Sequence, residues 1–322
     1  MKPHEQIPLD DIYAAQKRLD GKVIRTPLVR LNSDHAPNEI YLKLESLQPV
    51  NSFKLRGASN AMLLASNEQL SHGVYTASAG NAAQGVAWNA RRLGIACTIV
   101  VPEHAPQTKL DAITRLGAEI VSVPYDQWWQ VRVDHGYEPL EDWLYVDPAS
   151  DPAVMAGDGT IGLEILEDLP DVDAIVIPWG SGGLSCGIAS AVRALKPDTR
   201  LFACEVTTAA PLAASLAAGK PQPVAYIPSF VDGIGAKGVL AEMWPLASSL
   251  LDGSLVMELS ETAGAIRLMA ERNRIIAEGA GAVPVAAALA GKAGGGKLAC
   301  VVSGGNIDTR CLIQILNGDL PL

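Results

Sequence analysis

Lys54 lies in the stretch Asn51-Ser-Phe-Lys-Leu-Arg-Gly-Ala58, directly after an aromatic residue and among small ones. A lysine that forms a Schiff base must be partly desolvated, so that its amine can be neutral near pH 7. These neighbours suit such a lysine, although a solvated lysine at the start of a helix has the same local sequence. Lys54 is therefore a candidate nucleophile whose assignment depends on three other stretches.

The first of these stretches is a glycine-rich turn, which follows the apolar run at 174–178 and precedes a helical pattern. Glycines let backbone N–H groups approach a phosphate, and the start of the helix adds partial positive charge. A plain tight turn is the other interpretation. The spacing is not that of a dinucleotide fold or a P-loop, so a single phosphate fits best. The candidate residues are Gly180, Ser181, Gly182, Gly183 and Leu184.

The second stretch is Ser78-Ala79-Gly80-Asn81, again between a strand-like and a helix-like segment. Its hydroxyl, its backbone N–H groups and the helix start suit a carboxylate, and Asn81 could donate to a phenolic oxygen. An ordinary helix cap is the alternative. The third stretch is Val301-Val-Ser-Gly-Gly-Asn306, where Ser303 follows the last strand. Open α/β sheets bind ligands at such strand ends, although a simple turn has the same pattern.

Alternating strand and helix patterns around these stretches predict βαβ units and parallel sheets. We expect two domains, a large one made of 1–65 and 147–322 and a small one at 66–146; the resemblance described below implies that they bind the cofactor and carry the substrate loop, respectively. Helices are expected at 10–19, 57–65, 82–93, 109–116, 157–166, 184–195, 263–271 and 280–290, and strands at 40–45, 73–77, 96–101, 119–123, 174–178, 200–205 and 298–302.

The segment 125–142 is the least regular part of the sequence, with many charges and the pair Trp128-Trp129. It is predicted to be a surface helix and loop that closes over the site as a lid. The tryptophans could line a ligand entrance or pack between the two lobes.

Composition narrows the function classes. The chain has 322 residues, 48% of them apolar, and a formal charge of −10, which argues against nucleic acid and anionic membranes as partners. No apolar run is long enough for a bilayer, and the start lacks the apolar segment of a signal peptide. Five scattered cysteines without a Cys-x-x-Cys pair indicate reduced thiols in a cytoplasm, and the isolated histidines give no support for zinc.

Together the four stretches resemble the fold-type II pyridoxal phosphate enzymes, in the threonine/serine dehydratase branch that also contains serine racemase. The resemblance covers about 12–308 and implies an α/β fold with two open twisted parallel-type sheets in two lobes, with pyridoxal 5'-phosphate in the cleft between them. It implies that Lys54 holds the cofactor covalently, Phe53 flanks the ring and Asn81 bonds the ring oxygen. The glycine-rich turn would hold the phosphate.

The resemblance also places Ser303 at the pyridine nitrogen, and it assigns the loop Ser78, Ala79, Gly80 and Asn81 to the substrate carboxylate. Glu278 resembles a family glutamate near the cofactor and is predicted to be catalytic, although a helix-capping role is equally compatible. The residues after the lysine, Leu-Arg-Gly, have the dehydratase form.

Two departures from the family pattern stand out. Ala82 occupies the place of a usual histidine. In related enzymes a metal site uses a glutamate, a carbonyl and an aspartate; Glu205 and Ala209 match, but Pro211 stands where the aspartate would be. We therefore predict no metal.

The sequence thus predicts a cytoplasmic lyase, a homodimer by resemblance, that eliminates water and ammonia from a small amino-acid substrate. That substrate would be a 3-hydroxy amino acid such as L-threonine or L-serine, or a derivative, and the product a 2-oxo acid. The alternatives are a racemase or β-replacement enzyme with the same cofactor, or a catalytically weak binding protein of the same fold.

Overall fold

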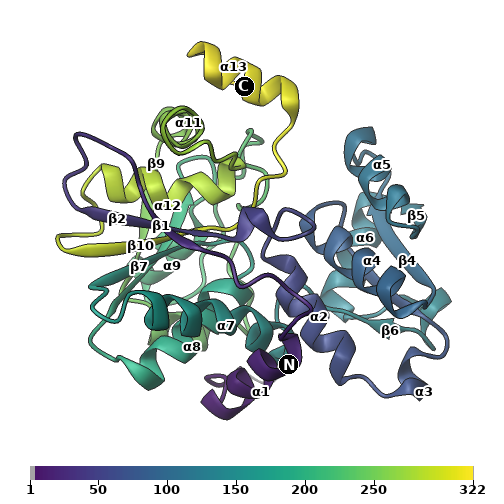
Figure 1. Cartoon of the computed structure of the whole chain (residues 1–322). Helices are drawn as coiled ribbons and strands as arrows, with labels where there is room; N and C mark the ends of the chain where they lie inside the picture. Colours follow the sequence, from purple (N-terminus) through teal and green to yellow (C-terminus); the bar gives the residue numbers. More distant parts are fainter. Residues whose placement is uncertain (1–3, 322) are drawn as a thin grey trace.

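Two sheets, each with its own helices, make up the computed structural model, which describes residues 4–321 (Figure 1). The predicted domain ends at 1–3 and 322 lie outside the described residues. The six-stranded sheet has the spatial order β1 (Leu28–Arg30), β2 (Glu39–Leu44), β10 (Lys297–Val302), β7 (Ala174–Pro178), β8 (Arg200–Val206) and β9 (Gly253–Met257). The four-stranded sheet has the order β5 (Glu119–Val123), β4 (Cys97–Pro102), β3 (Val74–Ala77) and β6 (Leu144–Tyr145).

All strand pairs are parallel except β1 with β2, which is antiparallel. The predicted α/β class with two parallel-type sheets is therefore confirmed. The division into domains stays a prediction; the strands of the smaller sheet all fall within 66–146.

Helices cover both faces of the larger sheet (Figure 1). Side chains alternate across β7: Ile175 and Ile177 join one core cluster, whereas Ala174 and Val176 join the other. This period of two is what a strand buried on both faces requires. The first cluster includes side chains of α1 (Leu9–Leu19), α7 (Pro152–Asp168), α8 (Gly183–Leu195) and α10 (Trp244–Leu250), and the second those of α11 (Leu259–Leu268), α12 (Gly279–Leu289) and α13 (Thr309–Asn317).

The smaller sheet is covered in the same way. One face packs against α4 (Asn81–Leu93), α5 (Gln107–Arg115) and side chains of α2 (Lys54–Leu64), and the other against α6 (Tyr125–Asp134). The shorter elements are α3 (Asn67–Leu70), α9 (Pro211–Ala218), the 3-10 turns at Glu45–Leu47 and Glu138–Leu140, and a π-helical turn at Met269–Asn273. None of the helices within 4–321 is long and apolar enough to cross a membrane.

Helix α2 is held between α4 of the small lobe and α7 of the large one. A Cβ on Gly85 of α4 would stand 2.9 Å from the Lys54 carbonyl oxygen, and one on Gly157 of α7 would stand 2.7 Å from that of Arg56. Both distances are shorter than real Cβ contacts, so only glycine allows the backbones to approach this closely. The close approach fixes the backbone of the first turn of α2, where Lys54 lies.

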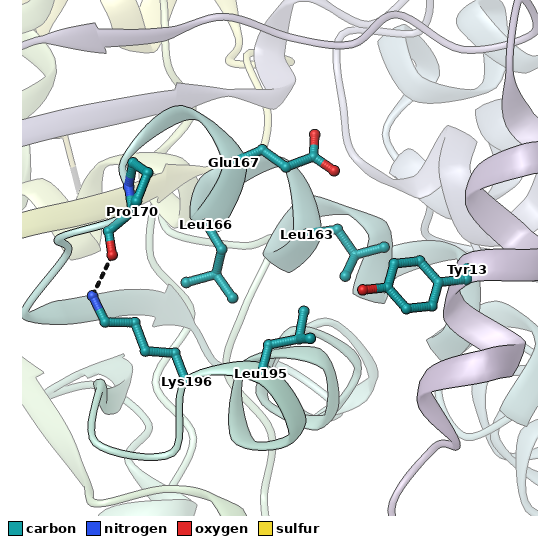
Figure 2. A pocket seen from close by; sticks show the side chains of 7 residues that line it. All are labelled: Tyr13, Leu163, Leu166, Glu167, Pro170, Leu195 and Lys196. Atoms are coloured by element: carbon teal, nitrogen blue, oxygen red, sulfur yellow. Dashed lines mark hydrogen bonds between the residues drawn. The ribbon is translucent and has the colours of Figure 1, made fainter.

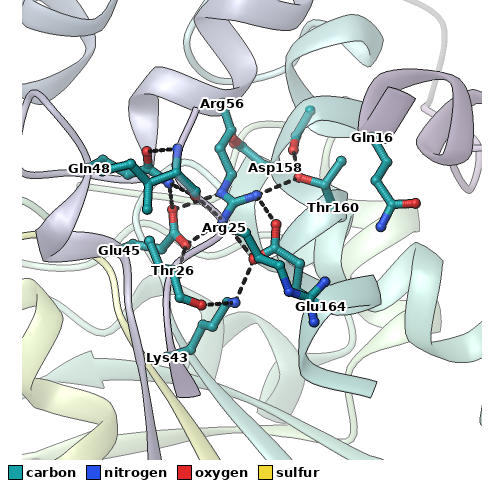
Figure 3. A network of polar contacts seen from close by, with 12 residues as sticks. Gln16, Arg25, Thr26, Lys43, Glu45, Gln48, Arg56, Asp158, Thr160 and Glu164 are labelled. Carbon is teal, nitrogen blue, oxygen red and sulfur yellow. Dashed lines mark hydrogen bonds and ion pairs between the residues drawn. The ribbon is translucent and has the colours of Figure 1, made fainter. Parts of the chain in front are cut away.

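A buried polar network anchors the same turn (Figure 3). The Arg56 guanidinium donates two hydrogen bonds of 2.8 Å to the Glu45 carboxylate and bonds of 2.6 and 2.9 Å to that of Glu164. Lys43 also donates to Glu164, at 2.5 Å. Burial by itself would raise the pKa of Glu45, but Arg56 offsets this and leaves that pKa lowered. The two buried cations, Lys43 and Arg56, thus neutralise the two buried carboxylates of Glu45 and Glu164.

Several elements differ from their predicted bounds. Helix α2 begins at Lys54 itself rather than three residues later, because Phe53 already has helical backbone angles. Helix α7 begins at Pro152, since Asp151 accepts a hydrogen bond from the N–H of Ala153 and caps it. Strands β6 and β9 and helices α9, α10 and α13 were not predicted.

We predict that Arg56→Met lowers the free energy of unfolding by about 3–5 kcal/mol, because it removes the cationic partner of the buried Glu45 and leaves Glu164 with Lys43 alone. Urea denaturation measures this loss. Arg25→Met is the matched control, since Arg25 pairs with Glu167 and Asp168 at the surface, and such pairs contribute about 1 kcal/mol or less. Equal losses in the two variants would contradict a special role for the buried network.

Candidate active site

Lys54 is the first residue of α2 and is half-buried. Its Nζ donates a hydrogen bond of 2.6 Å to the carbonyl oxygen of Pro148 and lies 4.9 Å from the centre of the Phe53 ring. Burial lowers the pKa of this amine, and so does the guanidinium of Arg132; Asp158 and Asp147 oppose the shift. A neutral acceptor and a lowered pKa are what a nucleophilic lysine needs.

Ser303 is held beside Lys54 by the main chain. The N–H of Phe53 donates to the Ser303 carbonyl at 2.9 Å, and Ser52 forms a bridge with Gly304. Ser303 is buried directly after β10, at the carboxyl end of a central strand. The structure therefore brings together two residues that are almost 250 positions apart in the sequence.

Asn81, the first residue of α4, links the two lobes. Its amide donates a hydrogen bond of 2.8 Å to Glu278, and its oxygen accepts one of 2.8 Å from Asn306. The Asn306 amide also donates to the Val50 carbonyl at 2.9 Å. No role was predicted for Asn306 from the sequence, although this residue ends the motif Val301-Val-Ser-Gly-Gly-Asn306. A polar side chain directly after two glycines was the signal that could have identified it.

Glu278 precedes α12 and is buried. Burial, followed by the charge of Asp232, raises the pKa of Glu278 to about 7, and the hydrogen bond from Asn81 only partly opposes this. The N–H of Glu278 donates to the Gly304 carbonyl at 3.0 Å. A carboxyl that titrates near neutral pH beside Asn81 suits a group that exchanges a proton.

The glycine-rich turn connects β7 to α8. Gly182 has a φ of 103°, and a Cβ there would stand 2.7 Å from the Trp179 ring; one on Gly183 would stand 2.6 Å from the Ala149 carbonyl. The backbone N–H groups from 180 to 185 have no backbone acceptor among the described residues. No acidic residue lies in the first turn of α8. The turn is therefore a cradle that fits one phosphate.

The loop before α4 is half-buried along its length. The Ser78 hydroxyl accepts a hydrogen bond of 3.2 Å from the N–H of Gly80, and no side chain caps the helix. Backbone N–H groups at the start of α4 thus stay available for an anion. The roles proposed for Ser78, Ala79 and Gly80 remain predictions.

The Glu205 carboxylate is occupied by hydrogen bonds from its own lobe. It accepts hydrogen bonds of 2.8 Å from the N–H groups of Leu212 and Ala213 and one of 2.7 Å from the Ser254 hydroxyl. Glu205 therefore accepts hydrogen bonds from free N–H groups in the first turn of α9, which begins at Pro211. No group of three or more His, Cys, Asp or Glu side chains that could hold a metal occurs in the described part of the chain.

The tryptophan pair lies on α6, which is helical where the sequence was least regular. Trp128 packs into the core beneath the small sheet, and Trp129 is 41% exposed. The Arg132 guanidinium stacks over both rings, at 5.2 and 5.5 Å from their centres. Packing within the small lobe thus accounts for Trp128, whereas the lid movement stays a prediction.

A separate hollow of about 270 Å³ lies on the outer side of α7 and α8 (Figure 2). Leucines and the ring of Tyr13 line it, and Lys196 donates a hydrogen bond of 2.5 Å to the Pro170 carbonyl at its edge. It contains none of the predicted site residues. This hollow is therefore separate from the predicted site around Lys54.

The chain matches the family model described as "Pyridoxal-phosphate dependent enzyme" over residues 19–304. This chain belongs to that family. It is 39% identical to an L-threonine ammonia-lyase of Thermotoga maritima, over 98% of this chain and 79% of that one. Maize serine racemase superposes with a TM-score of 0.87 at 31% identity and covers 98% of each chain. The processed threonine deaminase isoform 2 of Solanum lycopersicum has the same TM-score at 33% identity, with 98% of this chain and 89% of that one covered.

These comparisons confirm the predicted family, the cofactor and the lyase class. The residues of this chain also fit pyridoxal phosphate: the cradle at 180–184 would take its phosphate, Lys54 its carbonyl carbon and Asn81 its ring oxygen. The Ser303 hydroxyl would face the pyridine nitrogen. The individual roles of these residues stay predictions.

We expect borohydride reduction of the holoenzyme, followed by peptide mapping, to label Lys54. Its lowered pKa and its neutral hydrogen-bond acceptor, the Pro148 carbonyl, are the reasons. Mass spectrometry of the reduced peptide gives the measurement. A label on Lys43, whose pKa is also lowered by burial but which is tied to Glu164, would contradict the assignment.

Glu278 should make the stability of the protein depend on pH. Its folded pKa of about 7 lies above the ordinary value of 4.5, so the carboxyl stabilises the fold fully below pH 4.5. That contribution, about 3 kcal/mol, is lost as the pH rises through 7. Urea denaturation at several pH values measures this effect. Between pH 4.5 and 8 the free energy of unfolding of Glu278→Gln should rise relative to that of the parent by about this amount.

The control for this experiment is Glu271→Gln, because Glu271 is exposed. Its stability should follow that of the parent at every pH. Parallel curves for Glu278→Gln and the parent would show that the Glu278 carboxyl is not shifted.

Proposed function

We propose that the protein is a pyridoxal-phosphate-dependent ammonia-lyase that converts L-threonine, L-serine or a derivative of one to a 2-oxo acid and ammonia. The observation that carries the proposal is that the main chain ties Ser303 to Phe53, next to Lys54, while the Lys54 amine donates to the carbonyl of Pro148, beside the Ala149 that packs on the phosphate cradle. Asn306, three residues after Ser303, holds Asn81. The names of the threonine ammonia-lyase and the threonine deaminase support the same reaction. Their substrate is assigned to this chain as part of the proposal.

The chain's own residues divide the work. Backbone N–H groups at the start of α4 bind the substrate carboxylate, and the cradle holds the cofactor phosphate. The freed Lys54 amine, whose pKa is lowered, accepts the Cα proton. When bound, the cofactor supplies the electron sink that makes this proton acidic. The neutral hydroxyl of Ser303 would not keep the ring nitrogen charged, which favours loss of the β-hydroxyl over transamination.

Asn81 orients the cofactor in this proposal, and its hydrogen bond to Glu278 fixes which of its two N–H groups is free. The amide has two N–H donors, one of which goes to Glu278, so the other is available for the ring oxygen. Glu278 can therefore hold a proton next to the ring without a rearrangement of the loop. This is the role we propose for it.

We further propose that the enzyme is a homodimer in the cytoplasm that binds neither nucleic acid nor membranes. The family resemblance supports the dimer. Five free cysteines, four of them buried, suit a reducing compartment. The net charge of −10 disfavours polyanionic partners.

The test of the proposed substrate is 2-oxo acid release across a panel of 3-hydroxy amino acids, together with their N-acyl and O-phospho derivatives. Turnover of L-threonine or L-serine supports the proposal. Turnover of derivatives alone would narrow the substrate to those compounds. No release from any member would overturn the lyase assignment.

A racemase is the second candidate because of the similarity to maize serine racemase. Racemisation needs a proton acceptor on each face of Cα, and Lys54 supplies one. The other would come from the loop opposite, where Ala79 has no exchangeable proton. An ordered water would be a less well-positioned substitute.

We therefore expect L-serine and L-threonine to give 2-oxo acid, with at most a minor amount of the D-enantiomer, as measured by chiral chromatography. Ala79→Ser should increase the D-product, whereas Ala218→Ser, on an exposed helix end, should not. D-amino acid formed by the parent as fast as 2-oxo acid would replace the lyase with the racemase.

A further inference from the structure

Asp158 is a fully buried carboxylate against the first turn of α2. It lies on α7 in the run Met155-Ala-Gly-Asp-Gly-Thr160, and none of its surface is exposed. Its Oδ1 accepts a hydrogen bond of 3.1 Å from the N–H of Gly57. Because Gly57 follows Lys54 by three positions, the carboxylate lies beside the turn that carries the lysine.

The second oxygen of Asp158 has no partner. Oδ2 is buried, and no described residue donates a hydrogen bond to it. Figure 3 shows Asp158 at the edge of the Arg56 network, but neither Arg56 nor Lys43 donates to it. A buried carboxylate oxygen without a donor is costly, so helix capping alone does not account for an acid at this position.

The charges that face this pair come from four elements. Asp158 is in electrostatic contact with Lys54 and Arg56 of α2 and with Glu45, which precedes them. The charges of Asp158, of Asp147 after β6 and of Arg132 on α6 act on Lys54, whose Nζ itself donates to the Pro148 carbonyl. Among the neighbouring charges, that of Asp158 raises the pKa of Lys54 the most. Its own pKa is raised to about 7, with burial as the main cause and Lys54 opposing it.

We propose that Asp158 is a positioning residue that acts through Lys54: its buried carboxylate is the counter-charge that keeps the Lys54 nitrogen protonated while that nitrogen holds the cofactor. Arg56 is already neutralised by Glu45 and Glu164, so Lys54 is the cation left for Asp158 to balance. Screening by water is reduced, since Asp158 is fully buried where α7 packs against α2. Asp158 thus sets the pH range over which the cofactor stays reactive.

This inference rests on the proposed function only in that Lys54 must hold the cofactor, which the borohydride mapping tests separately. The experiment is a pH titration of the visible absorbance of the holoenzyme, which reports the proton on the Lys54 nitrogen. Asp158→Asn keeps an oxygen for the Gly57 N–H but removes the charge. The midpoint should fall by about 1–2 pH units, as expected for loss of a nearby opposite charge.

The matched control is Asp151→Asn on the same helix. Asp151 caps α7 through the N–H of Ala153, and asparagine caps equally well. Its midpoint and its pH profile for kcat/KM should equal those of the parent. For Asp158→Asn the alkaline limb of kcat/KM should move to lower pH with the absorbance, because the protonated nitrogen is the reactive form. An unchanged midpoint in folded Asp158→Asn would overturn the proposal, because a cap alone would alter stability and not the titration.

A second measurement needs no variant and applies if Asp158→Asn does not fold. Two coupled groups titrate in overlapping steps rather than as one site. The absorbance of the parent should therefore follow a curve broader than a single-site titration, and its midpoint should be insensitive to salt. A single-site curve that shifts with ionic strength would show that exposed charges govern Lys54 instead of Asp158.

Discussion

The buried pairing of Arg56 with Glu45 and Glu164 is the interaction on which the placement of the site depends. These carboxylates come from the turn after β2 and from α7, and the guanidinium comes from α2. A buried charge without its partners would be far too costly, so these three segments must meet in one arrangement. The network therefore holds α2 against the large sheet. The glycine contacts with α4 and α7 determine how closely α2 approaches those two helices.

Arg56 and Lys54 are two cations on the same helical turn with opposite surroundings. Arg56 is held by four hydrogen bonds to carboxylates, and its pKa is raised by those partners against the effect of burial. Lys54 donates only to a neutral carbonyl, and its pKa is lowered. One cation is thus permanently charged and structural, whereas the other can lose its proton. The contrast explains how a rigid helix start can present a reactive amine.

Local patterns in the sequence were sufficient for part of this arrangement. The aromatic residue before Lys54, the glycines at 180–183 and the strand-end Ser303 each have a local physical reason that can be read without a structure. Their order along the chain indicated the family. What could not be predicted depends on long-range packing: Asn306 supports Asn81 across more than two hundred residues, and the Pro148 carbonyl is a backbone group without a sequence signal.

Asp158 shows where a sequence signal existed and was missed. A single acid within a run of small and apolar residues is unusual, because an isolated buried carboxylate is disfavoured. Its meaning becomes clear only when α7 is placed against α2, since the partner lysine lies about a hundred positions away.

The same holds for Glu278, whose charge state depends on burial between the lobes. The two carboxyls with pKa values near 7 lie on α7 and at the start of α12: Asp158 lies beside the turn that carries Lys54, and Glu278 accepts a hydrogen bond from Asn81. Because burial raises both pKa values, the charge of each carboxyl is sensitive to pH near neutrality, at two different parts of the proposed site.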